Sequence, residues 1–246
     1  MKPSSPFVFT SGTIGYPLLF VLMIWIVFWA ELRFNLNLAP FGVRPGEAVG
    51  LRGIIFSPFI HSDIKHLFNN TIPLFILSLA LFYFYRPLRW KVLLIGLVST
   101  GLITWIIGRP ANHIGASGII YLLAAFLFFK GIFSKNYRLV ALSLIVVFVY
   151  GGLIWYVTPI DPKISWEGHL AGLLSGLGLA VVFKKQIAKP PKYHWESPDF
   201  KDSDDLFMQH FDEQGNFVDN LPFQNMEEEE TEYNYIYTEK KSDDKN

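Results

Sequence analysis

The sequence predicts an all-α polytopic membrane protein with six transmembrane helices. Hydrophobic residues make up 51% of the 246 residues, and the mean hydropathy is +0.31. Six stretches contain no charged residue, and their lengths of 28, 20, 17, 20, 22 and 16 residues approach the ~20 residues that a helix needs to cross ~30 Å of hydrocarbon. These stretches lack the short alternating segments of a membrane β-barrel, so helices remain as the structure that satisfies their backbone in lipid.

The six predicted spans lie between consecutive charged residues. They are 3–30, 66–85, 92–108, 110–129, 139–160 and 168–183. Within the first stretch, the helix is expected to run from Tyr16 to Ala30. The charged residues Glu31 and Arg33 follow it in place of a cleavage site, which argues against a removable signal peptide.

The connection between the first two spans, residues 31–65, is long and rich in Pro and Gly. It carries an apolar patch at 54–60 that is too short to cross a bilayer. Loops of this length usually have a function of their own. The patch is therefore expected to lie at the membrane interface or to re-enter the membrane.

Charge is divided unequally along the chain. Residues 1–192 hold 17 Lys/Arg and 5 Asp/Glu, a net charge of +12, whereas residues 193–246 hold 4 and 16, a net charge of −12. We therefore expect a short cytoplasmic N-terminus (1–15), a six-helix membrane domain (16–189) and an acidic, disordered cytoplasmic tail (190–246). The acidic run Glu227–Glu230 is typical of a solvated tail, and the sequence does not identify a partner for it.

The distribution of basic residues predicts the orientation in the membrane. One side of the predicted bundle carries 11 basic residues and the other carries 6. The positive-inside rule then places both termini in the cytoplasm. The chain has no cysteine, which excludes a disulfide, a thiolate nucleophile and a metal site with cysteine ligands.

Polar residues with catalytic potential stand at the starts of the second, fourth and sixth spans. With six spans, these three begin on the same side of the membrane. His66 opens the second, Ser117 lies just inside the fourth and His169 opens the sixth. At 1.5 Å per helical residue, Ser117 is expected ~10 Å below the surface. A serine and a histidine at this shared depth indicate nucleophilic catalysis inside a bilayer.

Small residues around these positions favour close contact between the fourth and sixth spans. The sixth span repeats glycine at four-residue spacing, a pattern that permits close backbone contact: Gly168, Gly172 and Gly176. Gly118 removes a side chain directly beside Ser117. Tyr121, four residues after Ser117 on the same helix face, is expected to pack against the imidazole of His169.

The second span offers donors for an oxyanion. His66 and Asn70 are i,i+4 neighbours, so both can aim donors at one point, together with the backbone N–H of Ser117. No carboxylate is placed to complete a Ser-His-Asp triad, because Glu167 is rotated away from His169 on a helix and Asp161 lies in the preceding loop. A Ser117–His169 dyad is therefore predicted.

Each of these features also has an ordinary structural interpretation. Serines in membrane helices usually bond to a backbone carbonyl or join helices, and we assign this role to four of them: Ser78, Ser99, Ser143 and Ser175. The glycine repeat is common in plain helix packing. The sequon at Asn69 stands at the head of a membrane span, where glycosylation is not expected, and His61 can be structural. The convergence of His66, Asn70, Ser117 and His169 favours function.

At these residues the chain resembles the rhomboid family of intramembrane serine proteases. The run Gly115–Gly118 resembles the family's Gly-x-Ser-Gly motif, and Tyr121 follows at the expected offset. Gly168-His169, with the glycines at 172 and 176, resembles its histidine helix, and His61, His66 and Asn70 resemble its second-helix motif. The resemblance covers about 16–185. It departs at Leu51-Arg52, where many members carry Trp-Arg.

The resemblance implies an intramembrane serine endopeptidase that cleaves transmembrane substrates. Such substrates unwind near the membrane surface and carry a small residue before the scissile bond. Ser117 is then the nucleophile and His169 the general base, with His66, Asn70 and the Ser117 N–H at the oxyanion. No metal or organic cofactor is expected. The expected partners are transmembrane proteins and the lipid bilayer, without nucleic acid, and the expected location is a bacterial plasma membrane.

Two other functions remain open from the sequence. A non-catalytic membrane-protein binder or quality-control factor on the same scaffold would share the packing glycines but would need no Ser–His contact. A transporter or channel fits poorly, because the polar residues cluster at one entrance and the sequence shows no pair of interrupted half-helices.

Overall fold

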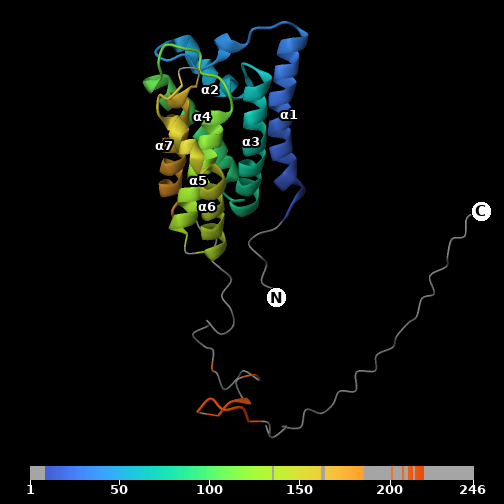
Figure 1. The fold of residues 1–246 in the computed structure, drawn as a ribbon, viewed down its shortest axis with the longest axis vertical. Coiled ribbons are helices and arrows are strands. Elements are labelled where there is room, and N and C mark those ends of the chain that lie inside the picture. Colours follow the sequence, from blue (N-terminus) through green and yellow to red (C-terminus); the bar gives the residue numbers. More distant parts are fainter. Residues whose placement is uncertain are drawn as a thin grey trace, which may run out of the picture. The chain divides into compact units, whose positions relative to one another are not determined.

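The computed structural model describes residues 9–134, 136–161 and 164–185, together with residues 201, 207, 210–212 and 214–218. The chain divides into two units, Met1–Pro191 and Lys192–Asn246. The first unit is a bundle of helices (Figure 1). The predicted all-α polytopic membrane fold is confirmed.

Six long helices form the bundle. They are α1 (Ser11–Arg33), α3 (Ile64–Phe84), α4 (Arg89–Ile107), α5 (Ser117–Phe133), α6 (Tyr137–Tyr150) and α7 (Trp166–Val182). The shorter elements are η1 (Ala39–Phe41), η2 (Ala48–Arg52), α2 (Gly53–Phe56), η3 (Ser57–Phe59) and η4 (Gly151–Val157). The segment with η1, η2, α2 and η3 lies across one end of the bundle (Figure 1).

The helices differ in length and in burial. Four stretches are long and apolar enough to cross a membrane: α1, α3, α4 and α6 with η4. The other two, α5 and α7, have 17 residues each, or about 26 Å at 1.5 Å per residue. Helix α5 contacts α3, α4, α6 and α7, and its Leu122, Phe126 and Leu127 are fully buried. The helix that carries Ser117 is therefore the centre of the fold.

Helices α5 and α7 touch through their backbones. A Cβ atom added to Gly172 would lie 2.2 Å from the carbonyl oxygen of Gly118, and one added to Gly176 would lie 2.3 Å from that of Leu122. No side chain fits at either place. The two glycines therefore fix the distance between the two helices, as the four-residue spacing predicts.

The boundaries of the fourth span differ from the prediction. The charge-free stretch is 110–129, but α5 begins only at Ser117, because Gly115 has φ +106°, outside the helical region. The helix then continues past Lys130, which the sequence places in a basic loop. Its side chain is fully buried and its ammonium donates to the carbonyl of Phe183, which follows α7. A cation there interacts favourably with the negative end of the α7 dipole. In the first span, α1 starts at Ser11 rather than Tyr16.

The apolar patch of residues 54–60 is only partly directed outward. Ile55 and Phe56 are exposed, whereas Ile60 is buried. Ile54 packs against α4, since a Cβ at Gly101 would lie 2.8 Å from its Cγ2. The patch thus attaches the first loop to α4 and leaves two large apolar side chains uncovered.

The serines assigned to structural roles bond mostly as expected. Ser78 and Ser99 donate to carbonyls of their own helices. Ser143 donates to Leu139 in its own helix and to Phe128 across the contact with α5. Ser175 differs, because within the described part of the chain its buried hydroxyl has no hydrogen-bond partner.

In the second unit, the described residues 210–212 and 214–218 include one antiparallel bridge. Phe211 and Phe217 pair in this bridge. The Asp212 carboxylate accepts hydrogen bonds from the backbone N–H groups of Gln214 and Asn216. Polar composition alone does not predict this local order. The rest of the predicted tail, including Glu227–Glu230, lies outside the described residues.

Candidate active site

Ser117 and His169 lie at the starts of two parallel helices. Ser117 is the first residue of α5, and His169 is in the first turn of α7. The Ser117 Oγ is 2.9 Å from His169 Nε2, and His169 Nδ1 is 2.9 Å from the carbonyl oxygen of Tyr156. A carbonyl only accepts, so Nδ1 carries the proton and Nε2 is free to accept from the Ser117 hydroxyl. This tautomer is the one that a general base requires.

Tyr121 holds the ring of His169 from one side. The two rings are stacked, with centroids 4.2 Å apart and planes 10° apart. The Tyr121 hydroxyl donates to the carbonyl of Leu153 at 2.7 Å. Leu153 and Tyr156 both belong to η4. Two main-chain carbonyls of one short element therefore orient the stacked pair.

Gly115 brings the loop before α5 against α3. Its N–H donates to the Ser57 carbonyl at 2.9 Å. A Cβ added to Gly115 would lie 2.7 Å from His66 Nε2 and 3.5 Å from Asn70 Nδ2. The missing side chain leaves both nitrogens facing the same small space next to Ser117.

Asn70 brings a buried donor to this space. The residue is 5% exposed, and its Nδ2 has no hydrogen-bond partner among the described residues. A buried donor that stays unsatisfied costs about 1–3 kcal/mol, so this amide is suited to an acceptor that enters the space beside it. The N–H of Ser117 belongs to the first turn of α5, where backbone donors have no partner within the helix. The arrangement suits an oxygen that gains negative charge.

The start of α3 fixes the ring of His66. Asp63 caps the helix, and its Oδ1 accepts from the His66 N–H at 2.8 Å. This bond, with a weaker contribution from the Ser62 hydroxyl, lowers the pKa of the Asp63 carboxyl. The Ser62 hydroxyl also lies 3.2 Å from His66 Nδ1, on the side of the ring away from Gly115. The capped first turn therefore places the His66 ring beside Gly115, with Nε2 2.7 Å from where a Cβ of that glycine would lie.

His61 packs beside His66, with ring centroids 5.0 Å apart. Burial, followed by the nearby His66, lowers the pKa of His61 to about 4. His61 is therefore neutral at pH 7, which suits a structural neighbour of His66.

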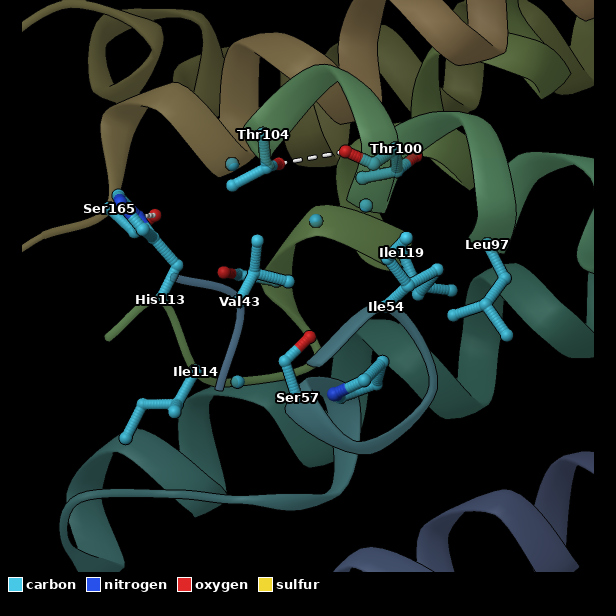
Figure 2. Close-up of a pocket in the computed structure, with 16 residues that line it drawn as sticks. Val43, Ile54, Ser57, Leu97, Thr100, Thr104, His113, Ile114, Ile119 and Ser165 are labelled. Atoms are coloured by element: carbon cyan, nitrogen blue, oxygen red, sulfur yellow. Dashed lines mark hydrogen bonds between the residues drawn. The ribbon is translucent and has the colours of Figure 1, made fainter. Parts of the chain in front are cut away.

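A cavity of about 40 Å³ lies beside Ser117. Figure 2 shows Thr100 and Thr104 of α4 on one side of it and Ser57 on another. The hydroxyl of Thr100 is buried and has no hydrogen-bond partner in the described part of the chain. Since a water needs about 10–15 Å³ of such space and polar partners, the cavity has room for a few water molecules. The cavity thus offers room for water beside the serine.

The structure brings the predicted site residues together at one end of the bundle. Two of them, Gly172 and Gly176, lie further along α7 and act through helix packing. Sequence reasoning missed the carbonyls of Leu153 and Tyr156, for which no side-chain pattern exists. It also missed a pairing of Arg109 with Glu167, although each is an isolated charge at the end of an apolar stretch. Within the described ranges, no three His, Asp or Glu side chains are grouped so that they could hold a metal ion.

Comparisons with known proteins find a matching family model and relatives of this chain. A family model described as "Rhomboid domain" matches residues 49–186. An uncharacterized protein of Mycobacterium tuberculosis (strain ATCC 25618 / H37Rv) is 35% identical over 170 residues, which cover 65% of this chain and 70% of the relative. An uncharacterized protein of Mycobacterium leprae (strain TN) is 33% identical over 176 residues, which cover 65% of this chain and 67% of the relative.

Proposed function

The chain belongs to the rhomboid family, and we propose that it is an intramembrane serine endopeptidase that cleaves transmembrane proteins. The observation that carries the proposal is the 2.9 Å contact between Ser117 Oγ and His169 Nε2, with Nδ1 held by a carbonyl. Structural serines in membrane helices usually bond to a backbone carbonyl. Ser117 instead bonds to a base in the tautomer that accepts its proton.

In the proposed reaction, Ser117 Oγ attacks the scissile carbonyl while His169 Nε2 takes its proton. The imidazolium then returns the proton to the leaving amine, which leaves an acyl-enzyme on Ser117. A water molecule, activated by His169, hydrolyses this ester. The polar cavity beside Ser117 supports the second half of the reaction, because it offers space for water.

The oxyanion of each tetrahedral intermediate is assigned to the space in front of Gly115. Asn70 Nδ2 and the Ser117 N–H would donate to it, and so would His66 Nε2 in the tautomer that carries the proton there. The buried amide of Asn70, whose Nδ2 has no hydrogen-bond partner among the described residues, supports this assignment most directly, because the reaction would supply an acceptor there.

The proposed substrates are membrane helices that unwind easily near the membrane surface. In an intact helix the scissile carbonyl is hydrogen-bonded and shielded by side chains, so it must be released before the serine can reach it. A small residue before the scissile bond suits the narrow space at Ser117.

We place the protein in a bacterial plasma membrane with both termini in the cytoplasm, from the 11-to-6 distribution of basic residues. The mycobacterial relatives support a bacterial setting. A reporter that is active only outside the cytoplasm, fused after Asn246, should give no signal, and a strong signal would reverse this orientation.

The proposed activity is tested with Ser117→Ala and His169→Ala. Each should abolish cleavage of single-span substrates and labelling by a fluorophosphonate probe, and the double variant should be no worse, because the two residues act as one unit. Ser99→Ala, which removes a helical serine that bonds to its own backbone, is the matched control and should keep wild-type activity. A folded Ser117→Ala protein that still cleaves would overturn the assignment. A wild-type protein that binds membrane proteins but never reacts would be a non-catalytic factor instead.

A further inference from the structure

Glu167 is a buried carboxylate that the proposed reaction does not use. It lies in the first turn of α7, two residues before His169, and its side chain is 2% exposed. Its Oε1 accepts a hydrogen bond from the backbone N–H of Arg109 at 3.3 Å and lies 3.7 Å from the Arg109 Nε. Taking a carboxylate out of water is costly unless it is paired, so this position requires an explanation.

Further bonds join the same two segments. The Arg109 guanidinium donates from Nη2 to the carbonyl of Ile164 at 2.8 Å. The His113 ring bridges the Arg109 carbonyl, 3.0 Å from Nε2, and the Ser165 hydroxyl, 2.5 Å from Nδ1. We call these residues the entrance cluster: Arg109, His113, Ser165 and Glu167. It binds the loop before α5 to the residues that lead into α7.

The cluster and the glycine contact lie on opposite sides of the catalytic pair. The loop of Arg109 and His113 leads directly to Ser117, and the segment with Ser165 and Glu167 leads to His169. On the other side of the pair, the contact of Gly172 with Gly118 fixes the two helices. The starts of the two helices also depend on what binds the loops, because the first turn of a helix lacks part of its own hydrogen bonds.

From this arrangement we propose that Glu167 is a positioning residue, which acts through Arg109 to align Ser117 with His169. The inference rests on the proposed protease function. It predicts a fall in kcat without a change in KM, because the cluster moves the reacting groups and leaves the substrate-binding surface intact. A misplacement of 1 Å can cost on the order of 10²-fold in rate.

The side-chain oxygen, more than the charge, should matter. Glu167→Gln keeps an oxygen that accepts from the Arg109 N–H, whereas Glu167→Leu removes it at similar volume. Glu47→Leu is the matched control, since it breaks another Arg–Glu pair, Arg44–Glu47 at 2.8 Å, whose side chains are half exposed.

The experiment measures kcat and KM on a single-span substrate, the rate of fluorophosphonate labelling and Tm, all on the full-length protein in detergent. Glu167→Leu should lower kcat and the labelling rate by on the order of tenfold or more, with KM unchanged. For Glu167→Gln, kcat and the labelling rate should stay within a few-fold of wild type. For Glu47→Leu, both should equal those of wild type.

Three results would overturn the inference: wild-type kcat in folded Glu167→Leu, a rise in KM that accounts for its loss, or an equal loss in Glu167→Gln. If Glu167→Leu does not fold, Arg109→Leu replaces it, because that side chain is 35% exposed. This variant keeps the backbone N–H bond to Glu167 and removes the guanidinium bond to Ile164, which joins the same two segments. Its kcat should fall with KM unchanged, and wild-type kcat would refute the inference that this joining aligns Ser117 with His169. A wild-type protein that neither cleaves nor reacts with the probe would instead remove the proposed function on which the inference depends.

Discussion

Gly115 combines two requirements that only glycine meets. Its φ of +106° is a backbone conformation that other residues adopt only with strain. The place of its missing side chain is 2.7 Å from His66 Nε2. The residue therefore shapes the proposed oxyanion space from the backbone side, while His66 and Asn70 supply donors from α3.

Gly115→Ala should lose activity because the new methyl group pushes His66 away and closes this space. Removal of one oxyanion donor typically costs on the order of 10²–10³ in turnover, and we expect a loss of at least that size, similar to those of His66→Ala and Asn70→Ala. Gly15→Ala is the control, since a Cβ there meets open space. Cleavage rates in detergent, with Tm measured in parallel, test the expectation, and a folded Gly115→Ala protein with normal turnover would contradict it.

At the residue scale, the sequence predicts those parts of the site that depend on side-chain chemistry. Ser117, His169, His66 and Asn70 are recognisable because a nucleophile, a base and donors are rare at the starts of apolar helices. The acceptor for His169 Nδ1 is not recognisable, because it is a main-chain oxygen. The buried position of Lys130 is not recognisable for a related reason. A charge at the end of an apolar stretch does not show whether a carbonyl inside the fold will accept its hydrogen bond.

At the scale of elements, the contact of α5 with α7 decides whether Ser117 and His169, the proposed catalytic pair, can meet. Gly172→Val would place side-chain atoms where the Gly118 carbonyl lies, 2.2 Å from the position of a Cβ. We expect the helices to separate, with loss of stability and of activity together. Overpacking of this kind typically costs about 1–3 kcal/mol or more.

The matched control lies on the same helix. Gly178 faces open space, so Gly178→Ala should keep activity and raise stability slightly, by about 0.4–1 kcal/mol, through lower chain entropy in the unfolded state. Thermal unfolding and cleavage of both variants check the pair. Equal behaviour of Gly172→Val and Gly178→Ala would show that the backbone contact is not needed.

The cap of α3 predicts a pH dependence. The pKa of Asp63 is lowered in the folded state from its ordinary value of 3.8. The stability that the ionised carboxylate adds to the folded state is therefore complete above pH 3.8 and is lost as the pH falls below it. Asp63→Ala should cost at most about 1 kcal/mol near pH 7, since the exposed carboxylate is screened by solvent.

Asp63→Asn separates the cap from the charge. Asparagine also caps helices well but does not titrate. Wild type should therefore lose stability relative to Asp63→Asn only at pH values below about 4, and the two should run parallel above it. Denaturation curves at several pH values measure this difference. A difference in stability between wild type and Asp63→Asn that appears above pH 5 would show that another group causes the effect.

Boundaries are the weakest part of the sequence prediction at this scale. A run without charges shows where lipid is tolerated, but it does not distinguish helix from a buried loop. Residues 110–116 contain no charge and so fall within the predicted span, yet the chain there follows a bent path that brings Gly115 against α3 and Ser117 to the start of α5. Hydropathy does not show the side-chain contacts at a site, although such contacts can end a helix inside a charge-free stretch.

At the scale of the whole molecule, the membrane unit contains every residue of the proposed site. The second unit begins at Lys192, after the bundle. Truncation after Lys192 should therefore leave cleavage of a model substrate within a few-fold of the full-length protein. Cleavage, membrane insertion and Tm of the truncated protein test this expectation. Loss of cleavage in a folded, inserted protein would show that the tail takes part in the active state.

The number and type of elements in the membrane unit follow from the sequence, because six apolar stretches separated by charges have few other solutions in lipid. The order of packing does not follow so directly. That α5 lies at the centre is indicated only by its small and apolar residues on all sides. The pairing of Arg109 with Glu167 joins residues 58 positions apart, so it can be seen only in the folded chain.

The use of main-chain oxygens in η4 has a genetic consequence. Every amino acid carries the same carbonyl, so replacing Leu153 or Tyr156 leaves the acceptor for Tyr121 or His169 in place as long as η4 keeps its path. A saturation screen would then score both positions as tolerant, although each holds a ring of the proposed site. Inserting or deleting one codon within 151–157 would shift the carbonyls past their partners. At η4, retention of activity should therefore depend on the length of the segment more than on the identity of its residues.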